Sequence, residues 1–161
     1  MNFRRENMII RAASMQDVDD VLLLYKTLFS EMAELQPDRW KKVSQDREFI
    51  ISTLRDDNFK LLVARDDNNN ITGFCIAQKK QTPPFKCLVQ RTYGYIIDVI
   101  VSQNVRSQGI GHKLLTEMNK WAQENNLTHL ELSVLSENIA ATKFYEREGY
   151  KEVNKLMAIT L

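Results

Sequence analysis

Apolar side chains recur at helical spacing in the segment that follows Ser14. The repeat predicts an amphipathic helix that ends before Pro37 and buries Val18, Val21, Leu22, Tyr25, Leu28, Phe29 and Met32. Ser14 followed three residues later by Asp17 is typical of a helix start, with the serine as cap and the acid in the first turn. Further helices are predicted over residues 46–54, 109–125 and 139–147.

Short apolar runs bounded by turn residues predict the strands of a sheet. These runs cover residues 8–11, 59–65, 71–79, 91–102, 130–135 and 150–160. The polar turn 66–70 joins two of them into a hairpin, and the Pro-containing loop 82–90 ends the third. The order of elements predicts an α/β fold in which a mixed sheet has helices on both faces.

Composition is ordinary for a single globular domain. The chain has 161 residues, 43% of them apolar and 27% charged, with a net charge of +1. We therefore expect one domain over residues 8–161, preceded by a flexible polar leader over residues 1–7. The balanced charge argues against nucleic acid as a partner. No apolar run approaches the ~18 residues that span a bilayer, so no membrane association is expected.

The two cysteines and two histidines indicate neither a metal site nor a disulfide. Cys75 and Cys87 lack metal-ligand spacing, and His112 and His129 are isolated. Cys75 lies in an apolar strand pattern, whereas Cys87 lies in a loop and could be an exposed thiol. Free thiols favour a reducing compartment, so we expect a cytoplasmic protein without a metal.

A glycine-containing turn follows the strand predicted over residues 91–102 and precedes a helix. It reads Arg106-Ser107-Gln108-Gly109-Ile110-Gly111. Glycines allow a ligand to approach the backbone closely, and the first-turn N–H groups of a helix attract an anion. Arg106 could add a charge-assisted contact. The turn is thus a candidate pyrophosphate site, or only a glycine turn between a strand and a helix.

A second motif lies about 30 residues after the glycine turn. It runs from Asn138 through Ala141, Phe144 and Tyr145 to Gly149-Tyr150. With this motif in the same order and separation, the chain resembles the GCN5-related N-acetyltransferases from about Met8 to Leu161. The resemblance implies a mostly antiparallel sheet with one splayed parallel pair, between which the pantetheine arm of acetyl-CoA lies.

The same resemblance implies a set of cofactor contacts. Main-chain atoms of the strand before the turn would bind pantetheine and the thioester, and the turn and the second motif would supply the rest. The implied cofactor-binding residues are Val99, Ile100, Val101, Arg106, Ser107, Gln108, Gly109, Ile110, Gly111, His112, Asn138, Ala141 and Phe144. Asn138 could equally be a helix N-cap, and the two roles are compatible.

Tyr145 and Asp98 are the candidate catalytic residues. Tyr145 stands at the motif position of a general acid, where its phenol would protonate the departing thiolate. The alternative is that it only packs a helix against the sheet. Asp98 interrupts an apolar strand, where an unpaired charge would be costly. It could accept the proton of the amine, bind the cationic amine, or pair with an arginine.

Three further residues are candidates for substrate binding. Glu31 is an acid in the apolar stripe of the first helix, although a solvated helix end explains it too. Tyr93 and Tyr95 alternate with Gly94 along the long strand and could line the acceptor side or pack across strands. Together with Asp98 they would surround a cationic substrate.

These features predict an enzyme that transfers acetyl from acetyl-CoA to a primary amine by direct attack in a ternary complex. No cysteine is placed for a covalent route. A small cationic amine, polyamine-like or aminoglycoside-like, is favoured, with a protein N-terminus or lysine as the alternative substrate. A non-catalytic acyl-CoA sensor is the alternative of another class. A homodimer that uses the last strand as a contact edge is left open.

Overall fold

The computed structural model describes residues 8–161; the leader expected over residues 1–7 lies outside the described residues. Five strands form one sheet in the order β1-β2-β3-β4-β5. They are β1 (Ile9–Ala12), β2 (Phe59–Arg65), β3 (Ile71–Gln81), β4 (Thr92–Val101) and β5 (Leu130–Leu132). The helices are α1 (Val18–Leu35), α2 (Arg47–Arg55), α3 (Ile110–Glu124) and α4 (Ile139–Arg147), with short 3-10 turns η1 (Met15–Asp17) and η2 (Gln103–Val105).

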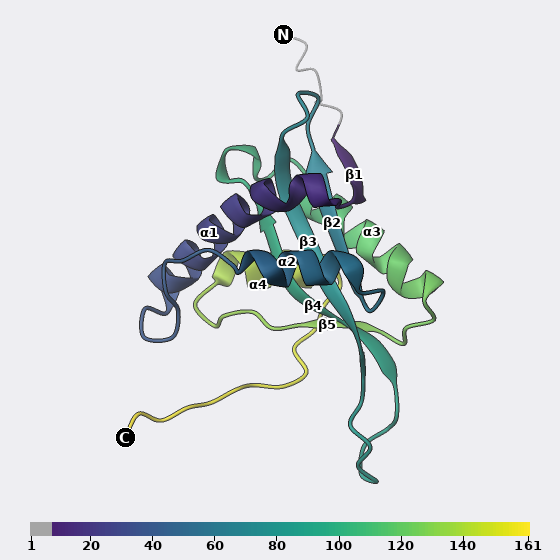
Figure 1. Ribbon diagram of the computed structural model, residues 1–161. Helices are drawn as coiled ribbons and strands as arrows, with labels where there is room; N and C mark the ends of the chain where they lie inside the picture. Colours follow the sequence, from purple (N-terminus) through teal and green to yellow (C-terminus); the bar gives the residue numbers. More distant parts are fainter. Residues whose placement is uncertain (1–7) are drawn as a thin grey trace.

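Helices cover both faces of the sheet, as expected (Figure 1). On one face, α1 and α2 enclose a core that includes Tyr25, Ile50, Phe74 and Ile76. On the other face, α3 buries the side chains Leu114, Leu115, Met118, Trp121 and Ala122 against the sheet. No helix among the described residues combines the length and apolar character that a membrane crossing requires.

Among the strands of the described residues, only β4 and β5 run parallel, and they pair over three residues, from Gly94 opposite Leu130 to Ile96 opposite Leu132. All other neighbouring strands are antiparallel. Strand β4 continues to Val101 while β5 ends at Leu132. The expected mostly antiparallel sheet with a parallel pair that separates is therefore confirmed. The separation leaves one edge of the last part of β4 without a partner strand among the described residues.

A β-bulge in β4 changes which side chains face which helix. Ile76 pairs with Asp98 and Ala77 pairs with Ile96, so Ile97 has no partner on β3. Ile96 belongs to the core under α3, whereas Ile97 packs on the core under α1. Asp98 also reaches α1, through a hydrogen bond. Simple alternation would have placed Asp98 on the same face as Ile96.

The prediction of a strand over residues 150–160 is wrong. Residues 150–161 carry no regular structure, and the C-terminal segment projects from the body of the molecule (Figure 1). Strand β5 also has three residues rather than the six expected over 130–135. A strand requires a partner for its backbone N–H and C=O groups, and no strand of the described chain lies beyond β5. The periodicity of the sequence does not supply that partner.

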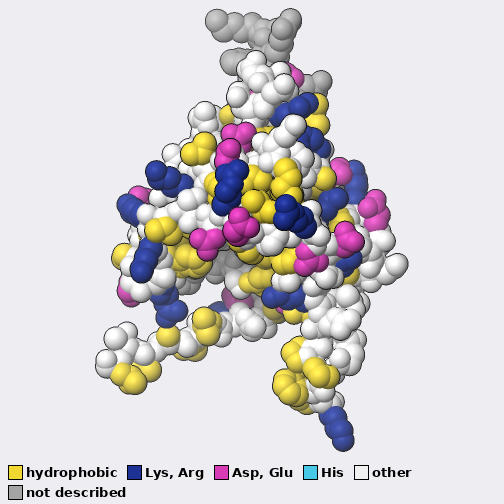
Figure 2. Space-filling model, viewed as in Figure 1, with side chains coloured by type: hydrophobic (Ala, Val, Ile, Leu, Met, Phe, Trp, Pro, Cys, Tyr) yellow, Lys and Arg dark blue, Asp and Glu magenta, His cyan; other side chains and the backbone are white. Residues whose placement is uncertain are grey.

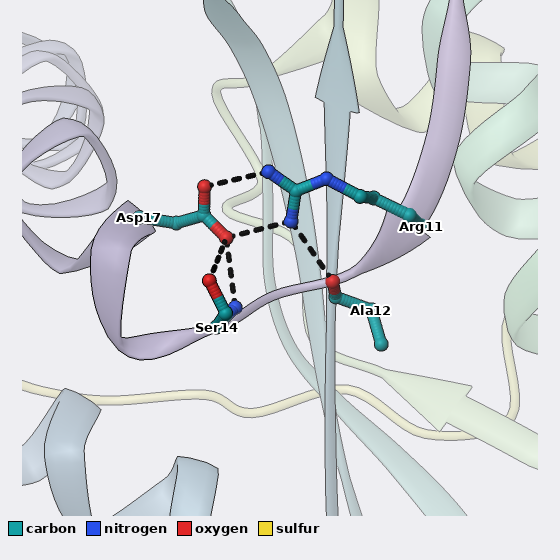
Figure 3. Close-up of polar contacts among 4 residues, drawn as sticks. All are labelled: Arg11, Ala12, Ser14 and Asp17. Atoms are coloured by element: carbon teal, nitrogen blue, oxygen red, sulfur yellow. Dashed lines mark hydrogen bonds and ion pairs between the residues drawn. The ribbon is translucent and has the colours of Figure 1, made fainter.

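An ion pair joins β1 to the start of α1 (Figure 3). Arg11 donates two hydrogen bonds to the carboxylate of Asp17, at 2.7 and 2.8 Å. Asp17 also accepts from the backbone N–H and the hydroxyl of Ser14, at 2.7 and 3.2 Å. Ser14 thus starts the turn η1 rather than α1 itself. The hydrogen bond from Arg11 lowers the pKa of the largely buried Asp17 carboxyl.

Replacing Asp17 with alanine is expected to lower the free energy of unfolding by about 1–3 kcal/mol, since it removes the carboxylate to which Arg11 and the Ser14 N–H donate and leaves Arg11 its bond to the Ala12 carbonyl oxygen. Because the folded-state pKa of Asp17 is lowered, its contribution is present above its ordinary pKa and is lost as the pH falls through the folded value. Urea unfolding at pH 7 and in acid measures both effects. Asp20→Ala, an exposed acid in the first turn of α1, is the control; an equal loss in both variants would contradict the prediction.

Candidate active site

The glycine turn lies where β4 ends and α3 begins. Gly109 is the residue that precedes α3, and its φ of 81° falls in the left-handed region that favours glycine. No side chain caps α3. The N–H groups of its first turn therefore lack an internal acceptor and, with the partial positive charge of the helix end, can receive an anion.

Gly111 has a different reason to be glycine. A Cβ built there would lie 2.9 Å from Cζ of Phe144, whereas a Cβ at Gly109 meets nothing within 4 Å. The ring of Phe144 on α4 thus occupies the space beside Gly111. The expectation that both glycines give room to a ligand therefore needs correction, because Gly111 gives room to α4.

Alanine substitutions at Gly109 and Gly111 are expected to lower stability for different reasons and by different amounts. Gly109→Ala should cost about 1 kcal/mol from the left-handed backbone alone, with little shift of the surroundings. Gly111→Ala pushes on Phe144 and should cost about 1–3 kcal/mol and disturb α4. Thermal unfolding together with binding of coenzyme A by calorimetry tests this. Equal effects of both substitutions would contradict separate roles.

Arg106 contacts the protein on two sides. Its Nε donates to the carbonyl oxygen of Val101 at 2.8 Å, and its Nη2 donates to the carboxylate of Glu31 at 2.8 and 3.1 Å. Gln103 donates to the same carboxylate at 2.8 Å. Glu31, a candidate for substrate binding, ties the end of α1 to the glycine turn through these contacts. Neither its neighbours in sequence nor its helical position indicated this partner, which lies 75 residues away.

Asp98 is held by a tyrosine rather than by an arginine. The Tyr25 hydroxyl on α1 donates to Oδ2 of Asp98 at 2.8 Å. Burial raises the pKa of Asp98 to about 6, and the hydrogen bond from Tyr25 opposes that rise. Burial and the neighbouring Asp98 charge both raise the pKa of Tyr25, so its phenol stays protonated. Tyr25 was not among the candidates from the sequence, because its position in the apolar stripe of α1 predicts only a core residue.

Tyr145 lies partly buried on α4 among other aromatic rings. Its ring centroid is 5.2 Å from that of Phe144 and 5.8 Å from that of Tyr150. Burial raises the pKa of Tyr145, and the negative charge of Asp98 adds to this rise. Asp98 lies beyond the residues of β4 that pair with β5, and Tyr145 packs on the core under α3.

Tyr150 has a buried hydroxyl for which the described residues offer no hydrogen-bond partner. Burying a hydroxyl without a hydrogen-bond partner costs free energy. The Tyr150 ring contacts that of Tyr145, so this unpaired hydroxyl belongs to the same aromatic group as the candidate acid. In the sequence, Tyr150 stands only as the end of the second motif. An aromatic residue at that position gave no sign of an unpaired hydroxyl.

Asn138 caps α4. Its side-chain oxygen accepts from the backbone N–H of Ala141 at 3.1 Å, which confirms the N-cap interpretation. Val99, Ile100 and Val101 pair on one side with β3 and have no strand of the described chain on the other. His112, in the first turn of α3, lies 2.8 Å from the Glu148 carboxylate through its Nδ1 atom.

The two tyrosines of β4 make contacts across strands. Tyr93 stacks on the ring of His129 at 5.0 Å, and the Tyr95 hydroxyl donates to the Ser133 hydroxyl at 3.2 Å. The ammonium group of Lys80 lies over the ring of Tyr95. These contacts agree with the packing interpretation of both residues. Within residues 8–161, no group of three His, Cys, Asp or Glu side chains is arranged to hold a metal ion.

Sequence relatives carry acetyltransferase names. An uncharacterized N-acetyltransferase of Archaeoglobus fulgidus is 28% identical over 144 residues, which are 89% of this chain and 93% of that protein. An uncharacterized N-acetyltransferase of Bacillus subtilis, YobR, is 27% identical over 63 residues, 39% of this chain. The match spans 26% of YobR, about a quarter of its length.

Solved structures share the fold. A mutant of the BH1408 protein from Bacillus halodurans superposes with a TM-score of 0.91 at 23% identity, over 95% of this chain and 99% of that chain. An aminoglycoside acetyltransferase from an uncultured soil metagenomic sample, in complex with sisomicin, has a TM-score of 0.73 at 22% identity, with 96% of each chain covered.

A third structure, of an aminoglycoside N-acetyltransferase in complex with CoA, has a TM-score of 0.75 at 14% identity, over 100% of this chain and 99% of that chain. The sequence pattern of the acetyltransferase (GNAT) family matches residues 23–150, most of the chain. The match includes β4, the glycine turn, α3 and α4. The chain therefore belongs to the GNAT family of N-acetyltransferases.

Proposed function

We propose that the protein transfers the acetyl group of acetyl-CoA to a primary amine by direct attack in a ternary complex. The observation that carries the proposal is the placement of Asp98 and Tyr145. Both have raised pKa values; Asp98 lies in the part of β4 beyond its pairing with β5, and Tyr145 packs on the core under α3. A carboxyl group poised near neutrality and a phenol that stays protonated form a suitable base and acid.

The residues around the glycine turn fit the pyrophosphate of coenzyme A. The uncapped first turn of α3 offers its N–H groups, and Gly109 leaves open space beside them. Arg106 uses its Nε and Nη2 groups within the protein, so its Nη1 group could reach a phosphate. We assign cofactor binding to Arg106 through His112, to Val99 through Val101, and to the segment of α4 that holds Asn138, Ala141 and Phe144.

The unpaired edge of β4 suits the pantetheine arm and the thioester. The edge N–H groups of residues 99–101 can donate to the pantetheine amides and to the carbonyl oxygen on which charge develops. Acetyl-CoA supplies an activated acetyl thioester. Asp98, directly or through a water molecule, accepts the proton that the amine loses as the C–N bond forms. Tyr145 donates its proton to the sulfur as the C–S bond breaks.

A small cationic amine is the favoured substrate class. Asp98 offers a carboxylate that attracts an ammonium group, and it lies on the α1 side of the sheet. Glu31 adds negative charge at the end of α1, although Arg106 neutralises it. Among relatives, a streptothricin acetyltransferase of Bacillus subtilis is 34% identical over 58 residues. Aminoglycoside acetyltransferases are among the similar structures.

The decisive experiment measures thiol release from acetyl-CoA against polyamines, aminoglycosides, amino acids and short peptides. We expect saturable turnover with one class of small cationic amine. Turnover only with peptides would replace the small amine by a protein substrate. Binding of acetyl-CoA without turnover on any amine would contradict the proposed acetyl transfer and favour a non-catalytic acyl-CoA sensor.

We also propose a cytoplasmic location and a homodimer. The free thiols of Cys75 and Cys87 support a reducing compartment. The C-terminal segment, which exposes many apolar side chains, supports the dimer.

A further inference from the structure

Strands β3 and β4 continue past the rest of the sheet as a two-stranded arm, with the loop 82–91 at its tip (Figure 1). Strand β2 pairs with β3 only up to Gln78, and β5 pairs with β4 only from Gly94 onward, so the arm extends beyond both neighbours. Three large apolar side chains at the tip are exposed, and they are Phe85 at 63%, Leu88 at 40% and Val89 at 74%. Apolar side chains gathered in this way at the end of a projection indicate a contact surface.

The arm carries charge of a single sign. Between Asp67 and Asp98 the sequence has no acidic residue. Four basic residues fall in the same stretch, and they are Lys79, Lys80, Lys86 and Arg91. Figure 2 shows apolar side chains along the projection and a basic side chain at its end. Because the whole chain has a net charge of only +1, the arm is a local basic region on a nearly neutral protein.

The loop at the tip satisfies much of its hydrogen bonding internally. The backbone N–H of Thr82 donates to the carbonyl oxygen of Arg91 at 3.0 Å, which closes the loop at its base. The side-chain amide of Gln90 donates to the carbonyl oxygen of Pro83 at 3.0 Å. Pro83 and Pro84 have no N–H group that needs an acceptor. Moving this tip out of water therefore leaves fewer polar groups without partners.

An anionic bilayer surface fits the arm better than a protein partner does. A standard protein interface takes about 800 Å² from each partner and matches charges of both signs, whereas the arm offers three apolar side chains and one sign of charge. A bilayer needs no complementary pocket, because apolar side chains enter the boundary below the headgroups while basic ones remain among them. The expectation of no membrane association depended on the lack of a spanning run, and peripheral contact needs none.

We propose that the β3–β4 arm docks the protein onto an anionic bilayer surface. Phe85, Leu88 and Val89 enter the boundary between headgroups and acyl chains, and the basic residues of the arm contact anionic headgroups. Thr92 and Val101 lie at opposite ends of β4, whose ten residues span roughly 30 Å. Docking through the arm thus leaves the glycine turn beyond Val101 facing away from the bilayer. The inference does not depend on the proposed acetyl transfer.

Sedimentation with lipid vesicles tests the docking. The wild type should bind vesicles of phosphatidylcholine with about 30% phosphatidylserine at least about tenfold more strongly than vesicles of phosphatidylcholine alone. High salt should weaken the binding, because it screens the attraction between the arm and the headgroups. Equal binding to both kinds of vesicle would overturn the proposal. So would no binding to the anionic vesicles, a result that would leave an acidic protein as the partner of the arm.

Two matched variants separate the tip from other exposed apolar side chains. Phe85→Ser with Val89→Ser removes two of them at the tip, and Leu23→Ser with Val43→Ser removes two exposed ones elsewhere. The tip variant should bind anionic vesicles about tenfold more weakly or less still, whereas the control should bind like the wild type. All four side chains are exposed, so thermal unfolding should remain cooperative in both variants. Equal effects of the two variants on vesicle binding would overturn the proposal.

A dye on the tip reports docking directly. Cys87 lies in the loop 82–91 and is exposed, whereas Cys75 is buried, so a polarity-sensitive maleimide dye labels Cys87 selectively. Anionic vesicles should shift the emission of this dye to shorter wavelength. The same dye on Val43→Cys, in a Cys87→Ser background, should show no shift. No shift at Cys87, or an equal shift at both positions, would overturn the proposal. Neither measurement depends on catalytic activity.

Discussion

Replacing Asp98 with asparagine is expected to lower kcat about 10²–10⁴-fold while the protein still binds acetyl-CoA. The substitution keeps the size of the side chain and an oxygen that can accept from Tyr25, but it removes the group that takes the proton from the amine. Thiol release with the amine identified by the substrate panel measures the loss. Asp38→Asn, at an exposed position, is the control. Retention of wild-type kcat would exclude Asp98 as the base.

The pH dependence of the wild type checks the same role. A base works in its deprotonated form, and burial raises the pKa of Asp98 to about 6. The rate should therefore rise with pH through about 6. Tyr25→Phe removes the hydrogen bond that opposes this rise, so the rising limb should move to higher pH. A limb that stays in place would show that Tyr25 does not set the pKa of Asp98.

Asp98→Asn should also stabilise the fold near neutral pH. The folded state holds the proton of Asp98 more tightly than the unfolded chain, so ionisation destabilises the fold as pH rises from the ordinary value near 4 to about 6. A shift of this size corresponds to about 3 kcal/mol, of which we expect about 1–3 kcal/mol to be recovered at pH 8. Urea unfolding should show this gain at pH 8 and a smaller one at pH 4. A gain that does not depend on pH would contradict the assignment.

Tyr145→Phe is expected to lower kcat about 10²-fold or more, because the departing thiolate loses its proton donor. Burial, with the charge of Asp98, raises the pKa of Tyr145, so the phenol keeps its proton throughout the working range. The rate of wild type should therefore show no fall near pH 9 to 10 from ionisation of this group. Steady-state kinetics with a saturating amine measures the effect.

Tyr150→Phe is the matched variant for Tyr145→Phe. The two rings touch edge to face, and both hydroxyl groups lie in partly buried side chains. The Tyr150 hydroxyl has no partner among the described residues, so its removal should preserve kcat and raise the melting temperature. If Tyr150→Phe lost activity and Tyr145→Phe retained it, the acid would be Tyr150.

The features that the sequence predicts depend on interactions between residues that are near one another along the chain. Helical periodicity predicts α1 because Val18, Val21 and Tyr25 must share the face that the core covers. The glycine turn and the second motif indicate the family, and they are the basis for the proposed place of the cofactor. Gly109 belongs to this class too, since its left-handed φ is a property of one residue.

Contacts between distant segments were decided by tertiary structure. Tyr25 meets Asp98 across 73 residues, and Arg106 meets Glu31 across 75. The bulge at Ile97 turns Asp98 toward α1, although simple alternation predicts the opposite face. Gly111 makes room for Phe144, a contact that no spacing indicates.

The last segment shows the boundary between the two kinds of information most clearly. Its alternation of apolar and polar residues is a property of the sequence and predicts a strand over residues 150–160. Whether a strand forms depends on a neighbouring edge that can pair its N–H and C=O groups, and residues 8–161 as described bring no such edge to it. Sequence determines the local preference of a segment, while tertiary structure decides whether a partner strand is there to pair with it.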